Sequence, residues 1–244
     1  MPSVTAALSV RADLTAAHAR AWRRLARPGT WWTGSERIAI AAETRHADDC
    51  LLCRKRKAAL SPDALLGAHD HLGQLPLAAV DAIHRIRTDP ARLSRSWMQR
   101  LSASGLTMER YVELIDIVAE TVAIDTFAKG VGTRQRELPI PVAGAPTQRQ
   151  PEGARAGGAW IDWVEPEDAS AEEAGMYPSD RAPANIHKAM SLVPDAVRGF
   201  FDLVEHQYLP GPAMRDFGRE YRAITHTQIE LLAGRVSALN RCLY

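Results

Sequence analysis

The stretch SERIAIAAETRHADDCLLCRKRKAAL, residues 35–60, predicts one long amphipathic helix that contains a CxxC pair, Cys50 and Cys53. Steps of seven, three, four, three and four residues separate Glu36, Glu43, His46, Cys50, Cys53 and Lys57. Side chains at these steps share one face of a helix. A carboxylate, an imidazole and two thiols on that face indicate a proton relay next to reactive cysteines.

The composition is that of an ordinary globular protein. The chain has 244 residues, of which 46% are hydrophobic and 24% are charged, enough for one large domain or two small ones. Lys and Arg number 30 against 29 Asp and Glu, so no overall field favours nucleic acid or an anionic membrane as a partner. The N-terminal sequence lacks a basic region followed by an apolar core, and no run approaches the ~20 apolar residues of a membrane span. We therefore expect a cytoplasmic protein.

Helical periodicity along the chain predicts an all-α fold. The pattern of residues 4–27 ends at Pro28-Gly29, and a long apolar helix begins at Thr107 and ends near Gly130. Thr225 or Thr227 is expected to begin the last helix. Short β-branched runs are interrupted by prolines, so no strand is expected.

Two helical regions are separated by a segment of different character. Residues 136–182 are rich in Pro, Gly and Ala, which predicts an irregular connector, although Trp160 and Trp163 are expected to pack onto the body of the protein. The predicted division is an N-terminal helical unit of residues 1–135 with the CxxC pair, the connector, and a C-terminal helical unit of residues 183–244.

The C-terminal unit resembles a known family. The segments NIHKAMSLVP, residues 185–194, and IELLAGRVSALNRCLY, residues 229–244, resemble the alkyl hydroperoxidase D-like branch of the carboxymuconolactone decarboxylase superfamily, especially its peroxidase-related members. In that family a Glu precedes by twelve residues a Cys within SxxNxCxYC, and a second Cys and a His follow. Glu230 and Cys242 match this step, but the chain ends at Tyr244, before the second Cys and the His. We expect that the chain is a shortened form of a longer protein; the alternative is that this second motif is only structural.

The same pattern can be laid on the first half, where Cys50 aligns with Cys242 and suggests an internal repeat. The resemblance then spans about residues 30–135 and 183–244, and it implies two related helical units. Ile38 stands where the family has Glu, and Lys57 stands where it has His. Glu43 and His46 are the expected substitutes for that acid and base.

The CxxC pair is expected to react through its thiolates. One cysteine attacks a peroxide oxygen or a disulfide sulfur, and the other resolves the product. His46 would accept the proton of Cys50, and Glu43 would orient His46. The residues leave open which cysteine attacks; the resemblance implies that it is Cys53.

The sequence therefore predicts an oxidoreductase, a cysteine-dependent antioxidant peroxidase or disulfide reductase with Cys50, Cys53, His46 and Glu43 as catalytic residues. No organic cofactor and no metal are expected, because electrons would arrive from a thiol reductant. The resemblance implies a homo-oligomer.

Three alternatives remain open. The first is a helical oligomer or binding protein without turnover, and the second is a pair of cysteines that are only buried apolar side chains. The third is a zinc site of His46, Cys50, Cys53 and Glu43, which one helix face would close poorly. His69 and His71 could also be metal ligands, but a surface turn is favoured there.

Overall fold

The protein is described by a computed structural model that covers residues 9–158, 160–179, 181–240 and 242. In these ranges the chain is mostly helical, so the predicted all-α class is confirmed. The α-helices are α1 (Ala12–Ala26), α2 (Gly34–His46), α3 (Leu51–Ala58), α4 (Leu77–Thr88), α5 (Arg95–Ala103), α6 (Met108–Gly130), α7 (Asn185–Ala189), α8 (Pro194–Gln207) and α9 (His226–Leu239).

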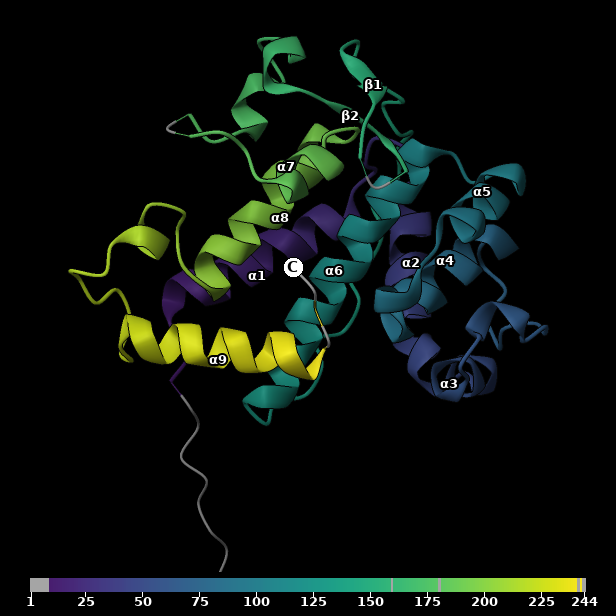
Figure 1. Ribbon diagram of the computed structural model, residues 1–244, viewed down its shortest axis with the longest axis horizontal. Helices are drawn as coiled ribbons and strands as arrows, with labels where there is room; N and C mark the ends of the chain where they lie inside the picture. Colours follow the sequence, from purple (N-terminus) through teal and green to yellow (C-terminus); the bar gives the residue numbers. More distant parts are fainter. Residues whose placement is uncertain (1–8, 159, 180, 241, 243–244) are drawn as a thin grey trace, which may run out of the picture.

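The longest helix, α6, lies at the centre of the molecule, with α2 and α4 on one side and α1 and α8 on the other (Figure 1). Its buried residues include Leu114, Ile117 and Val118, as is expected of a long apolar helix. Each such side chain contributes about 2 kcal/mol when it is fully buried. Within the described ranges, no helix combines the length and the apolar character that crossing a membrane requires.

A continuous hydrophobic core runs from Ala21 in α1 to Leu203 in α8, and it therefore includes residues of both predicted helical units. The boundary at the connector and the relation of the two units as repeats stay predictions.

Threonine caps begin three of the helices, two of which the sequence predicts at these threonines. The Thr33 hydroxyl accepts the backbone N–H of Glu36, and the Glu36 carboxylate accepts the backbone N–H of Thr33 in return, which forms a capping box. Thr107 caps α6, and Thr225 rather than Thr227 caps α9. A cap of this kind is worth about 1 kcal/mol.

The prediction of one helix from residue 35 to residue 60 is wrong. Helix α2 ends at His46, a 3-10 turn covers Ala47–Asp49, and Cys50 has an extended backbone, with φ −64° and ψ 121°, before α3 begins. Asp48 and Asp49 form the break, and aspartate favours turns and helix starts over helix interiors. The apolar periodicity continues across the break, so it could not reveal the change of direction.

The connector is mostly irregular, but it contains a short hairpin that the sequence did not predict. Strands β1 (Ala154–Ala156) and β2 (Asp162–Val164) pair antiparallel, with Arg155 opposite Trp163. Val164 is buried, and its N–H donates to the Ser191 hydroxyl at 2.8 Å, so the hairpin is joined to the second helical region. Of the two tryptophans expected to pack there, Trp163 is half-buried and Trp160 is exposed.

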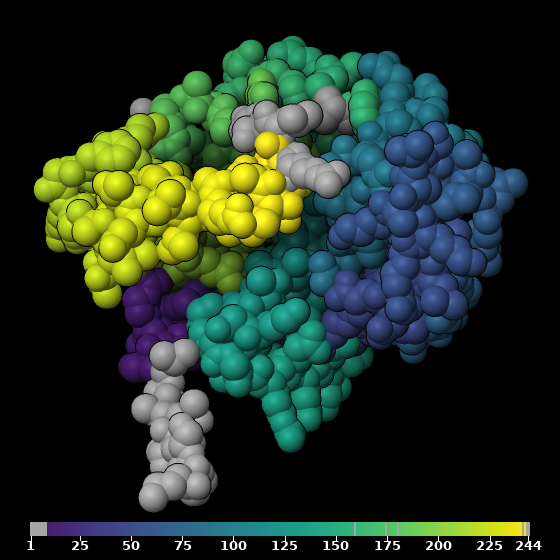
Figure 2. Space-filling model, turned by 60° about the horizontal axis from the view of Figure 1, so that its bottom comes forward, coloured from purple at the N-terminus to yellow at the C-terminus, as the bar shows by residue number. Residues whose placement is uncertain are grey.

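Helix α9 lies on the surface of the molecule, shown in yellow in Figure 2. Its buried residues are His226 and Ile229, both near its start. An apolar groove of about 1430 Å³ lies between α9 and the body. The groove is lined by side chains from both, among them Ile115, Val122, Leu232 and Val236.

Candidate functional site

The two cysteines lie at the first turn of α3, on the side of the molecule formed by α2, α3 and α4 (Figure 1). Cys50 is the residue before the helix, and Cys53 is in its first turn. Cys50 is 0% exposed and Cys53 is 3% exposed. Because Cys50 precedes the first turn, its sulfur lies near backbone N–H groups that have no partner inside the helix.

A buried imidazole and a carboxylate continue from Cys53 into the core. His84 Nδ1 lies 3.2 Å from Cys53 Sγ, and His84 Nε2 lies 2.8 Å from Glu43 Oε1. A carboxylate can only accept, so Nε2 carries the proton and Nδ1 of the neutral ring presents its lone pair to the thiol. The other oxygen of Glu43 accepts the backbone N–H of Leu72 at 3.0 Å. His84 is thus held between Cys53 and Glu43, and Glu43 is held in turn by the backbone of Leu72. These three side chains are called the Cys53–His84–Glu43 chain below.

A second imidazole reaches the cysteines from the segment between α3 and α4. His69 Nδ1 lies 3.6 Å from Cys50 Sγ and 3.4 Å from Cys53 Sγ, and its Nε2 lies 2.9 Å from Asp81 Oδ1 on α4. The expectation of a plain surface turn at residues 69–71 is therefore wrong for His69, whose side chain is only 7% exposed.

The pKa values of the Cys50 thiol and the His69 imidazole shift in directions that favour a thiolate beside an imidazolium. Burial would raise the pKa of the Cys50 thiol, but hydrogen bonds from the Cys53 backbone and from His69 lower it to about 7. Burial would lower the pKa of His69, but its hydrogen bonds to Asp81 and to both cysteines raise it to about 10. His69 is therefore an imidazolium at neutral pH, and it lies beside a thiol that ionises near neutral pH.

His84 has the opposite charge state. Its burial lowers its pKa, and although Glu43 opposes this effect, the positive charge of His69 adds to it. The two imidazoles at the cysteines therefore differ: His69 is a proton donor, and His84 is a neutral base.

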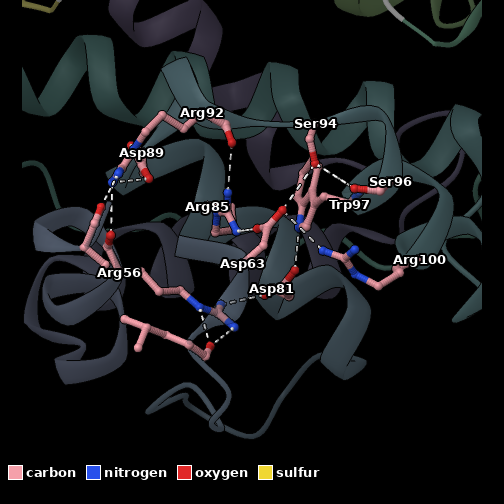
Figure 3. A network of polar contacts seen from close by, with 12 residues as sticks. Arg56, Asp63, Asp81, Arg85, Asp89, Arg92, Ser94, Ser96, Trp97 and Arg100 are labelled. Carbon is pink, nitrogen blue, oxygen red and sulfur yellow. Dashed lines mark hydrogen bonds and ion pairs between the residues drawn. The ribbon is translucent and has the colours of Figure 1, made fainter. Parts of the chain in front are cut away.

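Asp81 connects the site to a network of polar contacts among residues of α3, α4, α5 and the turns between them (Figure 3). Its carboxylate accepts hydrogen bonds from Arg56 at 3.1 Å and from the Trp97 indole at 2.7 Å, in addition to His69. Burial would raise the pKa of Asp81, but its bonds to His69 and Trp97 lower it to about 2. A cavity of about 610 Å³ reaches Asp81 and Arg56 from the surface between α4 and α5.

The structure brings together three of the four catalytic residues that the sequence predicted, Glu43, Cys50 and Cys53. His46 is not between Glu43 and the thiols, since His84 occupies that position. The Nε2 atom of His46 lies 3.7 Å from Asp70 Oδ1 instead. His46 shares a helix with Glu43 but not with Cys50, and the turn after it removes the common face on which the prediction depended.

The second predicted motif lies on and after α9. Glu230 accepts a hydrogen bond from the Tyr208 hydroxyl at 2.5 Å and lies 3.4 Å from His226 Nε2. Cys242 is exposed, beyond the end of the helix. Whether this pair is a second copy of the family motif stays a prediction.

No family model, no curated protein and no solved structure matches this chain. The site is therefore interpreted from its own geometry. Donor atoms of Cys50, Cys53, His69 and His84 all lie within 4.8 Å of one another, an arrangement that could hold a metal ion or act in redox catalysis.

Proposed function

We propose that the protein is a cysteine-dependent peroxide or disulfide reductase, in which Cys50 and Cys53 cycle between a dithiol and a disulfide. The observation that supports this most is the Cys53–His84–Glu43 chain, with contacts of 3.2 and 2.8 Å. It places a neutral base, held by a carboxylate, against one sulfur while the second sulfur lies one helical turn away. This is the arrangement that a resolving thiol requires.

Cys50 is the attacking cysteine in this proposal, in contrast to the expectation that Cys53 attacks. Its position at the start of α3 favours the thiolate. The thiolate bonds to one oxygen of hydrogen peroxide, the O–O bond breaks, and Cys50 becomes a sulfenic acid. The leaving hydroxide takes a proton from His69, whose Nδ1 lies 3.6 Å from Cys50 Sγ, and departs as water.

Cys53 then resolves the sulfenic acid. The Cys53 proton passes to His84 Nδ1, the Cys53 sulfur bonds to the Cys50 sulfur, and the S–O bond breaks. The displaced hydroxide takes the proton from His84 and leaves as the second water. Two thiols and one peroxide thus give one disulfide and two waters. An external thiol reductant returns two electrons and two protons by exchange.

Membership of the alkyl hydroperoxidase D-like branch, assembly into a homo-oligomer and a cytoplasmic location are proposals of the same kind. The first two are supported by the C-terminal resemblance and by a thiol, an imidazole and a carboxylate that are in contact in the first half. The cytoplasmic location is supported by the free thiols of Cys50 and Cys53, which a reducing compartment preserves.

The test is to trap the intermediate in the Cys242→Ser background, so that only Cys50 and Cys53 remain. The reduced, chelator-treated protein receives one equivalent of hydrogen peroxide. We expect the loss of both thiols and, by intact mass, of two hydrogens. With Cys53→Ser the reaction should stop at a Cys50 sulfenic acid that dimedone labels.

Two results would count against the proposal. Thiols that stay unmodified at neutral pH would refute redox function. A dimedone adduct on Cys53 in the Cys50→Ser protein, formed at the wild-type rate, would assign the attack to Cys53 instead.

A further inference from the structure

The four side chains that surround the thiol pair also have the donor set of a tetrahedral metal site. Two sulfurs come from the start of α3, one imidazole comes from α4, and one comes from the segment between these helices. Ligands from separate elements can close a tetrahedron, which a single helix face cannot do. Zinc bonds of about 2.3 Å to sulfur and about 2.0 Å to nitrogen put neighbouring ligands about 3.5 Å apart. The contacts here, 3.2, 3.4 and 3.6 Å, agree with that spacing.

Both imidazoles are already held as metal ligands usually are. Each points Nδ1 at the sulfurs and gives Nε2 to a carboxylate, Glu43 for His84 at 2.8 Å and Asp81 for His69 at 2.9 Å. A carboxylate behind a ligating histidine fixes the orientation of the ring and makes the inner nitrogen a better donor.

The site is also closed, as structural zinc sites are. Cys50 and His84 are 0% exposed, and the His69 side chain is 7% exposed. Two thiolates offset the charge of a divalent ion, so the burial of that ion leaves no net charge among the ion and its ligands. Thiolate and imidazole together favour Zn²⁺ over the oxygen-seeking Mg²⁺ and Ca²⁺.

We propose that the reduced protein binds one Zn²⁺ through Cys50, Cys53, His69 and His84, with Glu43 and Asp81 as the outer partners of the histidines. This differs from the expectation of no metal, and also from the alternative set of His46 and Glu43 with the cysteines, because His46 is not among the four converging donors.

Zinc and the disulfide exclude each other at this site, since both use the same two sulfurs. Hydrogen peroxide accepts two electrons from the two zinc-bound thiolates and, with two protons, gives two waters, one disulfide and a released Zn²⁺. The metal keeps its charge throughout. This release rests on the proposed redox function, whereas zinc binding itself does not.

Metal binding is tested first, on the reduced protein after treatment with a chelator. Titration with Zn²⁺ against a chromophoric competitor should show one equivalent bound. Titration with Co²⁺ should give the strong visible bands of a tetrahedral ion and a thiolate-to-cobalt charge-transfer band. Binding well below one equivalent, or the weak spectrum of octahedral cobalt, would overturn the proposal.

Variants then identify the ligands. His69→Gln and His84→Gln should each remove the tetrahedral spectrum, and Asp81→Asn should weaken zinc about 10- to 100-fold. His71→Gln is the matched control, since its ring accepts the backbone N–H of Gly73 at 3.0 Å and takes no part in the cluster. Unchanged zinc affinity in both His69→Gln and His84→Gln, with folding verified by circular dichroism, would overturn the assignment.

Release by peroxide separates this inference from the proposed function. One equivalent of hydrogen peroxide should free one equivalent of Zn²⁺ as the disulfide forms. Zinc that binds but is not released, with intact thiols, would support the metal site and refute the redox function. Rapid disulfide formation in a protein that binds no zinc would support the redox function and refute the metal site.

Discussion

Cys50 is the residue whose reactivity follows most directly from its position. It lies at the start of α3, where its sulfur accepts the backbone N–H of Cys53, and it is in contact with the His69 imidazolium. In metal-free, reduced protein, thiolate absorbance should therefore rise with a midpoint about two pH units below that of an ordinary thiol, near its pKa of about 7. Ultraviolet titration measures this, and Cys50→Ser should remove the step. A first midpoint at the usual thiol value would show that the site does not stabilise the thiolate.

The site residues divide into those that local sequence predicts and those that only the fold brings in. Glu43, Cys50 and Cys53 lie within eleven positions of one another, so spacing alone grouped them. His69 and His84 are 16 and 31 residues beyond Cys53. The fifteen residues between Cys53 and His69 match the spacing of a zinc-binding CxxC and its first histidine, but His84 is too far from His69 to complete that pattern. A second signal was that His84 lies on the apolar face of its helix, where a buried imidazole needs polar partners.

At the scale of elements, α6 carries acids that the core must accommodate. Asp116 is buried with one carboxylate oxygen unpartnered, and burial together with Glu120 and Glu113 raises its pKa well above the usual value. Because the folded state holds the proton more tightly, the stability that Asp116 contributes is complete below the unfolded pKa of 3.8 and is lost as pH rises through the folded pKa.

The Asp116→Asn variant should not show this loss of stability as pH rises, because asparagine does not ionise. Relative to the variant, the wild-type free energy of unfolding should fall by up to about 1.4 kcal/mol per pH unit above the unfolded pKa. Denaturant titrations at several pH values measure it. Asp202→Asn is the control of opposite sign, since the Arg20 hydrogen bond lowers the pKa of Asp202 and its contribution is lost as pH falls. A pH-independent difference for Asp116→Asn would show that Asp116 is ionised in the folded protein.

Helix starts could be predicted because their caps are local contacts, whereas the break after α2 could not, because distant residues stabilise it. Thr33, Thr107 and Thr225 cap helices through contacts three residues away, which a sequence displays directly. The turn of residues 47–49 is stabilised by its surroundings: it packs against α4, and Arg87 on α4 pairs with Asp48. Long-range contacts of this kind leave no periodic signal.

At the scale of the whole molecule, α9 buries few side chains for a helix of 14 residues. His226 and Ile229 are its buried residues, and the apolar groove separates much of its length from the body. We expect amide hydrogens of α9 to exchange much faster than those of α6, because few buried contacts oppose local opening. Hydrogen exchange followed by mass spectrometry measures both. Equal protection would contradict this and would indicate that a partner, such as a second copy of the chain, covers the groove.

The proton relay is tested most directly by comparing two histidines, one inside the thiol site and one beside it. His84 contacts Cys53 and Glu43, whereas His46, the base that the sequence suggested, lies beside Asp70. Disulfide formation by peroxide is followed by rapid mixing in the metal-free protein. We predict that His84→Gln slows the step by about a hundredfold or more and that His46→Gln leaves it unchanged. A slow His46→Gln beside a wild-type rate in His84→Gln would contradict the relay.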